Sequence, residues 1–261
     1  MREVGTGLVE ADVVGHRADV LLARPEKRNA MNEDLLSDLR RAFEEVLADD
    51  DVRAIALLGE GPVFSAGMDL EMMRDRGLSE SGAGPGLRAV TDAIDDARVP
   101  TVVGVKRAAP AGAFELTLPA DFRVISEDAQ YGVVEVKLGV FPMGGAPTRL
   151  SRLVGLAKAK ELVLSGELID PREAERIGLV NEVCSAEEVD DRTRELADEL
   201  TENAPLGMAA AREALNAALE LPIDESLDHE RDLGEALTHT RDYEEGFTAR
   251  IEGREPAFEG R

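Results

Sequence analysis

The sequence predicts an α/β fold with a helical C-terminal region, and three observations support this prediction. Short segments rich in β-branched residues alternate with apolar residues at helical spacing. Several of the strand-like segments are apolar throughout, which is typical of strands that are largely buried. From about residue 187 the pattern becomes almost entirely helical.

The first elements follow one another as strand, helix, strand and loop. Residues 20–24 are an apolar strand pattern, and residues 29–51 carry leucine, valine and phenylalanine at helical spacing. Residues 52–59 form a second strand pattern, and the small residues of 61–70 indicate a turn. The Gly/Ser-rich stretch 77–86 has no apolar period, so we expect a mobile surface loop there.

The same alternation returns in the middle of the chain. Residues 100–105 and 122–126 predict strands, with a short helix between them over 111–118. The remaining segments with helical patterns are 147–155, 156–166, 189–205 and 206–221. We place the α/β core at residues 1–190 and a helical C-terminal region at 191–261.

Length and cysteine content argue for a single cytoplasmic body. The 261 residues suffice for one large domain, or for one with a small appendage. No apolar run is long enough for a membrane span, and the first residues lack the layout of a signal peptide. The single cysteine, Cys184, and the scattered His16, His229 and His239 give neither a disulfide framework nor zinc-ligand spacing. We therefore expect no bound metal.

The charge of the chain excludes two classes of partner. With 54 acidic and 30 basic residues, the formal net charge is −24, which repels nucleic acid and anionic membranes. Acids are spread along the whole chain, lysine is scarce beside arginine, and tryptophan is absent. This composition favours a protein adapted to a high-salt cytoplasm, with an ordinary acidic cytosolic protein as the alternative.

Two glutamates are candidates for proton transfer. The sequence holds no GxSxG, Walker, HExxH or GxGxxG motif. Glu115 and Glu135, however, stand among apolar residues, where burial raises a carboxyl pKa toward the neutral range. The alternative is that either is an ordinary surface acid. Residues 64–70 and 110–116 are small-residue loops that allow a ligand to approach backbone N–H groups, although each read alone is only a turn.

Taken together, these segments resemble the enoyl-CoA hydratase/isomerase (crotonase) superfamily, in the same order over nearly the whole chain. The segments that carry the resemblance are KRNAMN (27–32), LLGEGPVFSAGMDL (57–70), VPTVVGV (99–105), FELTLPADFRV (114–124), YGVVEVKLGVFPMGGAPTRL (131–150), LSGELIDPREAERIGLVNEV (164–183) and FTARIEGREPAFEGR (247–261). The resemblance implies a crotonase-like spiral of repeated ββα units. It also implies a helical C-terminal region that builds homotrimers, often paired into hexamers.

The resemblance assigns roles to the two small-residue loops. Backbone N–H groups of Met68 and Gly112 would form an oxyanion hole for a thioester, with Gly112 at the start of a helix. Ala66 and Leu70 would line the pocket for the CoA adenine, and Asp69 is counted with the CoA-binding residues.

The resemblance also assigns the acids and the entry segment. Glu115 and Glu135 match the two catalytic glutamates of the hydratases, in which Glu135 would protonate the α-carbon and Glu115 would hold and activate water. Lys27 or Arg28 would meet phosphate, and Ala30 would border the ligand.

Some positions depart from the family pattern. Lys106 and Arg107 replace a usual Asn-Gly ahead of a triple glycine that is mostly lost, which reduces backbone freedom at the oxyanion hole. Val133 and Met143 stand where a hydratase often has a polar water-holding side chain and a glycine, and Gly253 replaces a frequent CoA-contacting lysine.

Because both glutamates are retained, we expect an enoyl-CoA hydratase that acts on an acyl-CoA thioester in fatty acid metabolism. CoA would be part of the substrate, and no separate cofactor is expected. Two alternatives stay open. A double-bond isomerase needs one glutamate and consumes no water, and an acyl-CoA-binding relative would have lost turnover.

Overall fold

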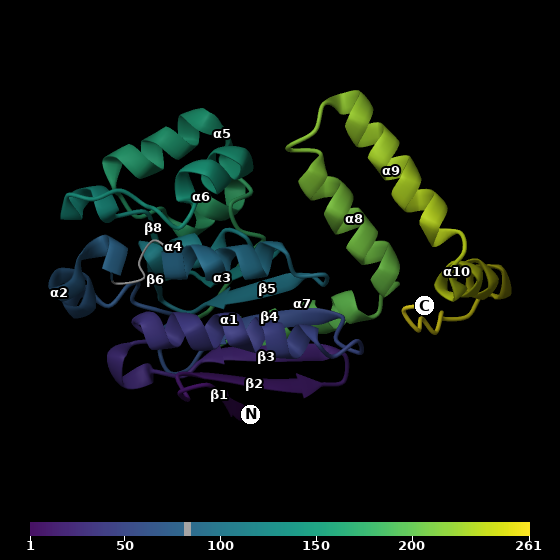
Figure 1. Ribbon diagram of the computed structural model, residues 1–261, viewed down its shortest axis with the longest axis horizontal. Helices are drawn as coiled ribbons and strands as arrows, with labels where there is room; N and C mark the ends of the chain where they lie inside the picture. Colours follow the sequence, from purple (N-terminus) through teal and green to yellow (C-terminus); the bar gives the residue numbers. More distant parts are fainter. Residues whose placement is uncertain (81–84) are drawn as a thin grey trace.

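The computed structural model describes residues 1–80 and 85–261 (Figure 1). Its strands are β1 (Arg2–Val4), β2 (Val9–Val14), β3 (Arg17–Leu22), β4 (Ala54–Gly59), β5 (Thr101–Val105), β6 (Ala108–Pro110), β7 (Phe122–Ser126), β8 (Gln130–Gly132) and β9 (Glu182–Cys184). Its helices are α1 (Glu33–Leu47), α2 (Leu70–Glu80), α3 (Pro85–Asp95), α4 (Gly112–Thr117), α5 (Ala146–Ser165), α6 (Pro171–Arg176), α7 (Val189–Thr201), α8 (Pro205–Ala217), α9 (Ile223–Leu237) and α10 (Arg241–Glu252). Two 3-10 turns complete the set, η1 (Pro25–Lys27) and η2 (Glu135–Leu138).

The large sheet has the strand order β1-β2-β3-β4-β5-β7-β9. The first three strands are antiparallel neighbours, and every pair from β3 onward is parallel. Parallel strands with helices between them confirm the predicted α/β class. The strand patterns at 52–59, 100–105 and 122–126 correspond to β4, β5 and β7.

Both faces of the central strand β4 are buried, and its residues show why. Its Ile55 and Leu57 belong to the main apolar core, which also contains residues of α1 and α3. Ala54 and Ala56 point to the other face and pack with Ala197 of α7. Small side chains on that face let α7 lie close to the sheet, so the strand is apolar throughout instead of alternating.

A repeated strand-strand-helix unit brings the middle of the chain together. β5 and β6 lead into α4, and β7 and β8 lead into η2. The short strands β6 and β8 pair in parallel, with Pro110 opposite Gly132, and the N–H of Ala111 donates to the carbonyl of Gly132 at 2.9 Å. This pairing sets the start of α4 beside η2, and so places Glu115 and Glu135 in neighbouring segments.

The predicted loop at 77–86 is partly wrong. Residues 77–80 continue α2, and α3 begins at Pro85, because Pro is favourable in the first turn of a helix. The rest of the predicted loop, 81–84, lies outside the described residues. The two helical patterns on either side of Gly155 form α5, and Gly155 itself has non-helical backbone angles.

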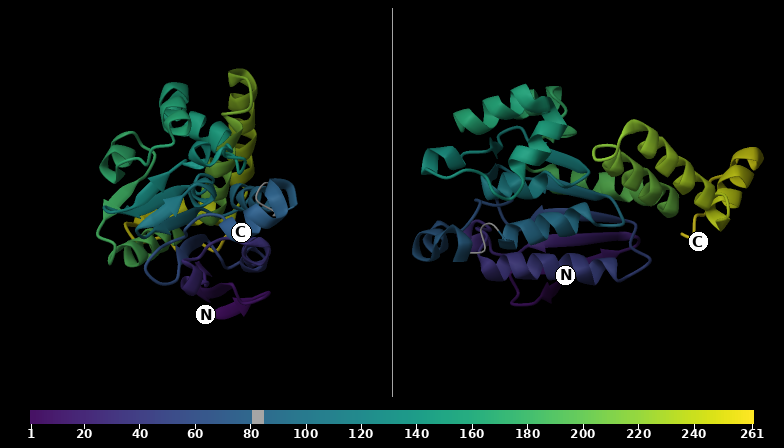
Figure 2. Two further views of the ribbon diagram at one scale, coloured as in Figure 1. Left: turned by 90° about the vertical axis from the view of Figure 1, so that its left-hand side faces the viewer. Right: turned by 45° about the horizontal axis from the view of Figure 1, so that its top comes forward.

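The helices after residue 187 differ in how they contact the core. α7 packs on the sheet through the buried Thr193 and Ala197, and the boundary that we predicted at residue 190 falls inside this helix. α8 and α9 project away from the sheet as an arm, with α10 at its end (Figures 1 and 2). Arg212 fastens α8 to the core by donating to a carboxylate oxygen of Asp121 at 2.8 Å and to the carbonyl of Asp95 at 2.7 Å.

Among the described residues, no helix is both long enough and apolar enough to cross a membrane.

Candidate active site

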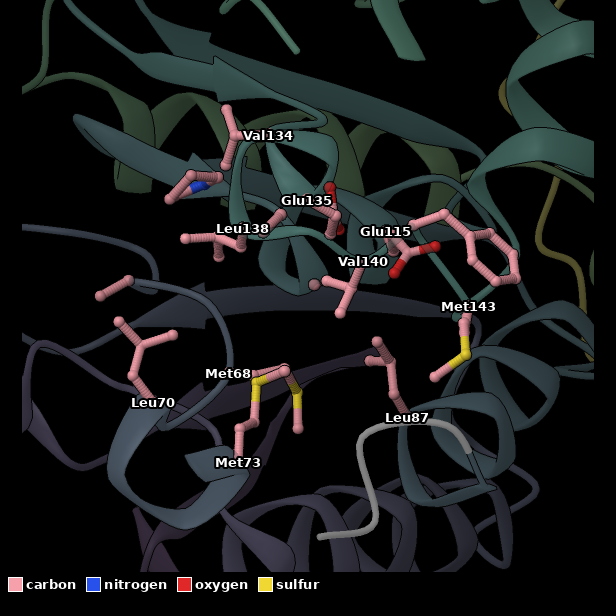
Figure 3. A pocket seen from close by; sticks show the side chains of 15 residues that line it. Met68, Leu70, Met73, Leu87, Glu115, Val134, Glu135, Leu138, Val140 and Met143 are labelled. Carbon is pink, nitrogen blue, oxygen red and sulfur yellow. The ribbon is translucent and has the colours of Figure 1, made fainter. Parts of the chain in front are cut away.

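A pocket lies between α4, η2 and the segment that leads into α2 (Figure 3). Glu115 and Glu135 enter it from one side, and apolar side chains including Met68, Met73 and Leu87 lie opposite them in Figure 3. The two carboxyl groups are the only ionisable side chains of its described lining. An apolar ligand in this pocket would therefore meet two carboxyl groups.

The side chain of Glu115 lies against the N-terminus of the long helix α5. Glu115 comes from α4 and is 3% exposed. The backbone N–H of Ala146, the first residue of α5, donates to Glu115 Oε1 at 3.0 Å. Burial raises the Glu115 pKa, whereas the N–H groups of Ala146, Gly144 and Gly145 and the charge of Arg149 act against that rise. The ionised form of Glu115 is thus well supported for a buried carboxylate.

Glu135 has the opposite surroundings. It begins η2 and is 8% exposed, yet neither carboxylate oxygen has a hydrogen-bond partner among the described residues. Burial raises the Glu135 pKa to about 7, and the negative charge of Glu115 adds to the rise. At neutral pH a large share of Glu135 is therefore protonated.

The two environments separate the pair into a base and an acid. We expect Glu115 to lose its proton first, because the N–H of Ala146 donates to its Oε1, whereas neither Glu135 oxygen has a hydrogen-bond partner among the described residues. Its charge then opposes ionisation of Glu135. Two titratable groups whose pKa values are pushed apart in this way can act as base and acid in one reaction. The catalytic roles stay predictions, but the structure places both residues in one pocket.

The two predicted oxyanion-hole residues, Met68 and Gly112, also line this pocket. Neither backbone N–H donates a hydrogen bond to any described residue. The two segments are in close contact, since a Cβ atom added to Gly112 would lie 3.0 Å from Cγ of Met68. Two unpaired donors beside one pocket are what a developing oxyanion requires.

The loop before α4 carries backbone strain. Ala111, the N-cap of α4, has φ 53° and ψ −127°, a conformation that favours glycine. The loss of the triple glycine predicted reduced backbone freedom in this loop. In the structure, the residue with the strained backbone is Ala111. Pairing of β6 with β8 holds the strained residue, because its N–H donates to Gly132.

The predicted CoA-binding residues fall into two groups. Ala66 and Leu70 line the pocket, and Leu70 is 64% exposed at its edge. Lys27, Arg28 and Ala30 lie outside the pocket lining, although the carbonyl of Arg28 accepts from the N–H of Ala66 at 2.9 Å. Their contact with CoA stays a prediction.

Asp69 also lies outside the pocket lining and has a structural partner. Its Oδ2 accepts from Arg24 Nη1 at 3.0 Å, and its Oδ1 accepts from the backbone N–H of Met72 at 3.2 Å. The side chain therefore fixes the start of α2, which carries the pocket residues Leu70 and Met73.

The unusual Lys106 and Arg107 do not line the pocket. Lys106 Nζ lies 2.7 Å from a carboxylate oxygen of Asp190 in α7. Arg107 has φ 50° and forms ion pairs with Asp128 and Glu187. Both side chains thus link the end of β5 to acids elsewhere.

Several pocket residues gave no signal in the sequence. Val133, singled out at a water-holding position, is fully buried in the apolar core, and its neighbour Val134 lines the pocket instead. Met73 and Leu87 come from α2 and α3, two helices that the sequence did not predict. Met143, the other departure, does line the pocket.

Across residues 1–80 and 85–261, no three His, Cys, Asp or Glu side chains gather as metal ligands would.

Comparisons with known proteins agree along almost the whole length. The sequence pattern of the enoyl-CoA hydratase/isomerase family matches residues 17–261. A probable enoyl-CoA hydratase of Mycobacterium tuberculosis is 34% identical over 257 residues, which cover 98% of each chain. The short-chain-enoyl-CoA hydratase of Clostridium acetobutylicum is 33% identical and covers 92% of this chain and 93% of that one. The crystal structure of an enoyl-CoA hydratase from Bacillus anthracis has a TM-score of 0.92 at 27% identity, covering 97% of this chain and all of the other.

Proposed function

The chain belongs to the enoyl-CoA hydratase/isomerase family, and on that premise we propose that it is an enoyl-CoA hydratase. The reaction adds water across the 2,3-double bond of a 2-enoyl-CoA and gives a 3-hydroxyacyl-CoA. The family match and the structural neighbours also confirm the crotonase-like α/β fold that we expected.

The observation that carries the proposal is the pair of unlike glutamates in one pocket. Glu115, ionised and held by backbone N–H groups, takes a proton from water as the oxygen bonds to C3. Glu135, whose pKa is raised to about 7, gives its proton to C2. The two steps together add one H₂O, and exchange of one proton restores the pair.

The thioester oxygen carries negative charge between these steps. The unpaired N–H groups of Met68 and Gly112 are placed to stabilise it, and an isomerase of this family would need the same donors. The second glutamate is what favours hydration, because moving a double bond requires only one group that takes and returns a proton.

We further propose that CoA is bound as part of the substrate. Its adenine would lie near Ala66 and Leu70, and its phosphates near Lys27 and Arg28. Ala30 and Asp69 belong to the two CoA-binding segments, which Arg24 joins by donating to the carbonyl of Ala30 and to Asp69 Oδ2. The enzyme would work in the cytoplasm without a separate cofactor.

Assembly into a homotrimer or hexamer is also part of the proposal. The arm formed by α8–α10 exposes many large apolar side chains, and Ile251 is 85% exposed. A monomer in water would leave this surface uncovered, which is unusual for a soluble domain. Sedimentation measurements in molar salt determine the subunit number.

The deciding experiment mixes the purified protein with crotonyl-CoA in molar salt and identifies the product by mass spectrometry. Hydration gives a 3-hydroxybutyryl-CoA that is one water heavier than the substrate. A product of unchanged mass with a displaced double bond would instead show an isomerase. Binding without any product would show that the chain has lost turnover.

A further inference from the structure

One peptide unit connects Glu115 to residues outside the pocket. This is the peptide between Gly144 and Gly145, immediately before α5. On one side, the N–H of Gly145 faces Glu115, next to the Ala146 N–H that donates to Oε1 at 3.0 Å. On the other side, the carbonyl of Gly144 accepts from Arg149 Nη1 at 3.4 Å.

A second donor, Thr91 of α3, reaches the same carbonyl. Its buried Oγ1 lies 3.4 Å from the oxygen of Gly144 and 3.0 Å from the carbonyl oxygen of Arg88, so its single hydroxyl proton is shared between two carbonyl groups. Two side chains from different helices, Thr91 and Arg149, therefore converge on one carbonyl oxygen. Each contact is long for a hydrogen bond, so neither alone holds the peptide firmly.

The geometry of a peptide makes this carbonyl decisive for Glu115. In a planar trans peptide the C=O and the N–H point in opposite directions. Fixing the Gly144 carbonyl toward Arg149 therefore fixes the Gly145 N–H toward Glu115. If this peptide turned over, a carbonyl oxygen would face the carboxylate and one donor would be lost.

Rotation of this peptide has a low energetic cost, because both of the residues that it joins are glycines. Gly145 has φ 115°, a backbone angle that other residues rarely adopt. A Cβ atom on Gly145 would also lie 2.1 Å from Arg149 Nη1, so glycine is needed for Arg149 to reach its place. The two glycines allow Arg149 to approach the peptide closely. They do not hold the peptide in one orientation, so a side chain must do so.

Arg149 is itself held rigidly. The side chain is 16% exposed, and its Nη2 donates to Asp95 Oδ2 at 2.7 Å and to Asp92 Oδ1 at 3.5 Å. Both acids belong to α3, as does Thr91. The planar guanidinium therefore spans from α3 to the Gly144 carbonyl with little freedom.

We propose that Arg149, together with Thr91, is a positioning residue that holds the Gly144–Gly145 peptide with its N–H toward Glu115. The inference rests on the proposed hydratase function for its kinetic consequences, but not for the peptide geometry itself. Around Glu115 the charged groups are Arg149 on α5 and Glu135 on η2, and Asp92 and Asp95 face Arg149 from α3.

The competing explanation is that Arg149 only joins α3 to α5. In that case its loss would reduce stability and leave the chemistry of the folded enzyme unchanged. The two explanations differ in kcat and in the orientation of one peptide. They differ in the titration of Glu115 only where the positive charge at residue 149 is kept, as in Arg149→Lys, because that charge acts on Glu115 directly.

The test compares Arg149→Met, Arg149→Lys and Thr91→Val with the wild type. Arg152→Met is the matched control, since Arg152 lies on the same helix and forms an ion pair with Glu220 at 3.7 Å. With crotonyl-CoA we expect Arg149→Met to lower kcat by about tenfold to a hundredfold, in the lower range for a catalytic group because it acts indirectly. KM should change little. Arg149→Lys should recover part of the loss, and Thr91→Val should lower kcat in the same direction.

Two further measurements do not need turnover. The first is ¹³C NMR titration of Glu115, assigned by Glu115→Gln; the Glu115 pKa should rise in Arg149→Met because one donor and one positive charge are lost. The second is a crystal structure of each variant, which shows the direction of the Gly144 carbonyl. If the wild type does not hydrate crotonyl-CoA, the function proposal fails while these two measurements still decide the positioning role.

The positioning role is overturned if Arg149→Met and Arg152→Met have the same kcat and the same Glu115 titration. It is equally overturned if the Gly144 carbonyl keeps its direction in Arg149→Met and in the Thr91→Val/Arg149→Met double variant. Should Arg149→Met fail to fold, Arg149→Lys decides, because it keeps the positive charge while its single ammonium group cannot contact both the acids of α3 and the Gly144 carbonyl as the guanidinium does. An unchanged Glu115 titration in that variant overturns the proposal.

Discussion

The two sides of the pocket that carry the glutamates solve the burial of a carboxyl group in different ways. On α4, Glu115 lies against the N-terminus of α5 and accepts a backbone hydrogen bond. On η2, Glu135 is almost as buried, but its oxygens have no partner among the described residues. Since both side chains are buried to a similar extent, we attribute the expected difference in ionisation to the backbone donor at Glu115 rather than to burial.

The backbones of the two sides also differ. The chain before α4 is strained at Ala111, with φ 53°. The turn η2 ends at Gly139, whose φ of 77° costs a glycine nothing. The side that holds the base is therefore rigid at some energetic cost, while the side that holds the acid is relaxed in its backbone.

The largest expected effect comes from removing either carboxyl group. Glu115→Gln and Glu135→Gln should each lower kcat by about 10² or more, the usual range for a positioned acid or base. Acyl-CoA binding should change little, because glutamine has nearly the same shape. Steady-state kinetics with crotonyl-CoA and binding titrations check both statements. Turnover at the wild-type rate in one variant would remove that residue from the mechanism and break the comparison.

Removing an oxyanion donor should have an effect of similar size, common to both sides of the pocket. Gly112→Pro deletes one N–H at the first residue of α4, where proline is tolerated, and should lower kcat by roughly 10² to 10³, or about 3 to 4 kcal/mol.

Gly112→Ala is the control for this variant, because it keeps the N–H. Its Cβ would meet the flexible side chain of Met68 at 3.0 Å, so a small loss of stability is expected from both variants. Unfolding and turnover must be measured together. Undiminished activity in a folded Gly112→Pro enzyme would exclude Gly112 from the site.

The pH dependence of kcat/KM separates the two glutamates directly. The reaction needs Glu135 protonated, and its pKa is raised to about 7, so kcat/KM should fall as pH rises through about 7. It should also fall at low pH, where Glu115 gains a proton. The residual activity of Glu135→Gln should lose the fall near pH 7, and persistence of that fall would assign it to another group.

The same raised pKa has a consequence for stability. Because the folded pKa of Glu135 lies above its unfolded value of 4.5, its contribution to stability is present below pH 4.5 and lost as pH rises through about 7. Relative to the wild type, Glu135→Gln should therefore gain stability between pH 5 and pH 8, on the order of 3 kcal/mol. Denaturant unfolding at both values measures this gain.

Strain on the α4 side predicts a smaller change. Ala111→Gly should raise the free energy of unfolding by about 1 kcal/mol, because relief of an unfavourable φ outweighs the greater freedom of glycine in the unfolded chain. The matched substitution Ala113→Gly, inside α4, should instead destabilise. Equal losses in both variants would show that Ala111 carries no strain.

Salt should raise stability without altering the order in which the two glutamates lose their protons. Screening relieves repulsion in a chain of net charge −24, so the melting temperature should rise between dilute buffer and molar salt. The pH at which kcat/KM falls should move less, because Glu135 is buried away from ions. A melting temperature that is flat or falls with salt would contradict adaptation to high salt.

The fold class and the identity of the two candidate acids could be predicted from the amino-acid sequence alone. Strand and helix patterns are local, so β4, β5, β7, α1 and α4 were found close to their true positions. Glu115 and Glu135 stood out because each has apolar neighbours in the chain. Helices α2 and α3 were missed, because the glycine- and serine-rich stretch between them gave no apolar period.

The difference between the surroundings of the two acids depends on contacts between distant parts of the chain, and the sequence did not predict it. The pairing of β6 with β8 brings their segments together, and no local pattern specifies that pairing. The donor to Glu115 comes from Ala146, thirty-one residues away, and the hold on Gly144 comes from Thr91 and Arg149. A carboxyl pKa depends on the donors and charges within a few ångströms, and those neighbours are set by how the chain folds rather than by the residues beside it in the sequence.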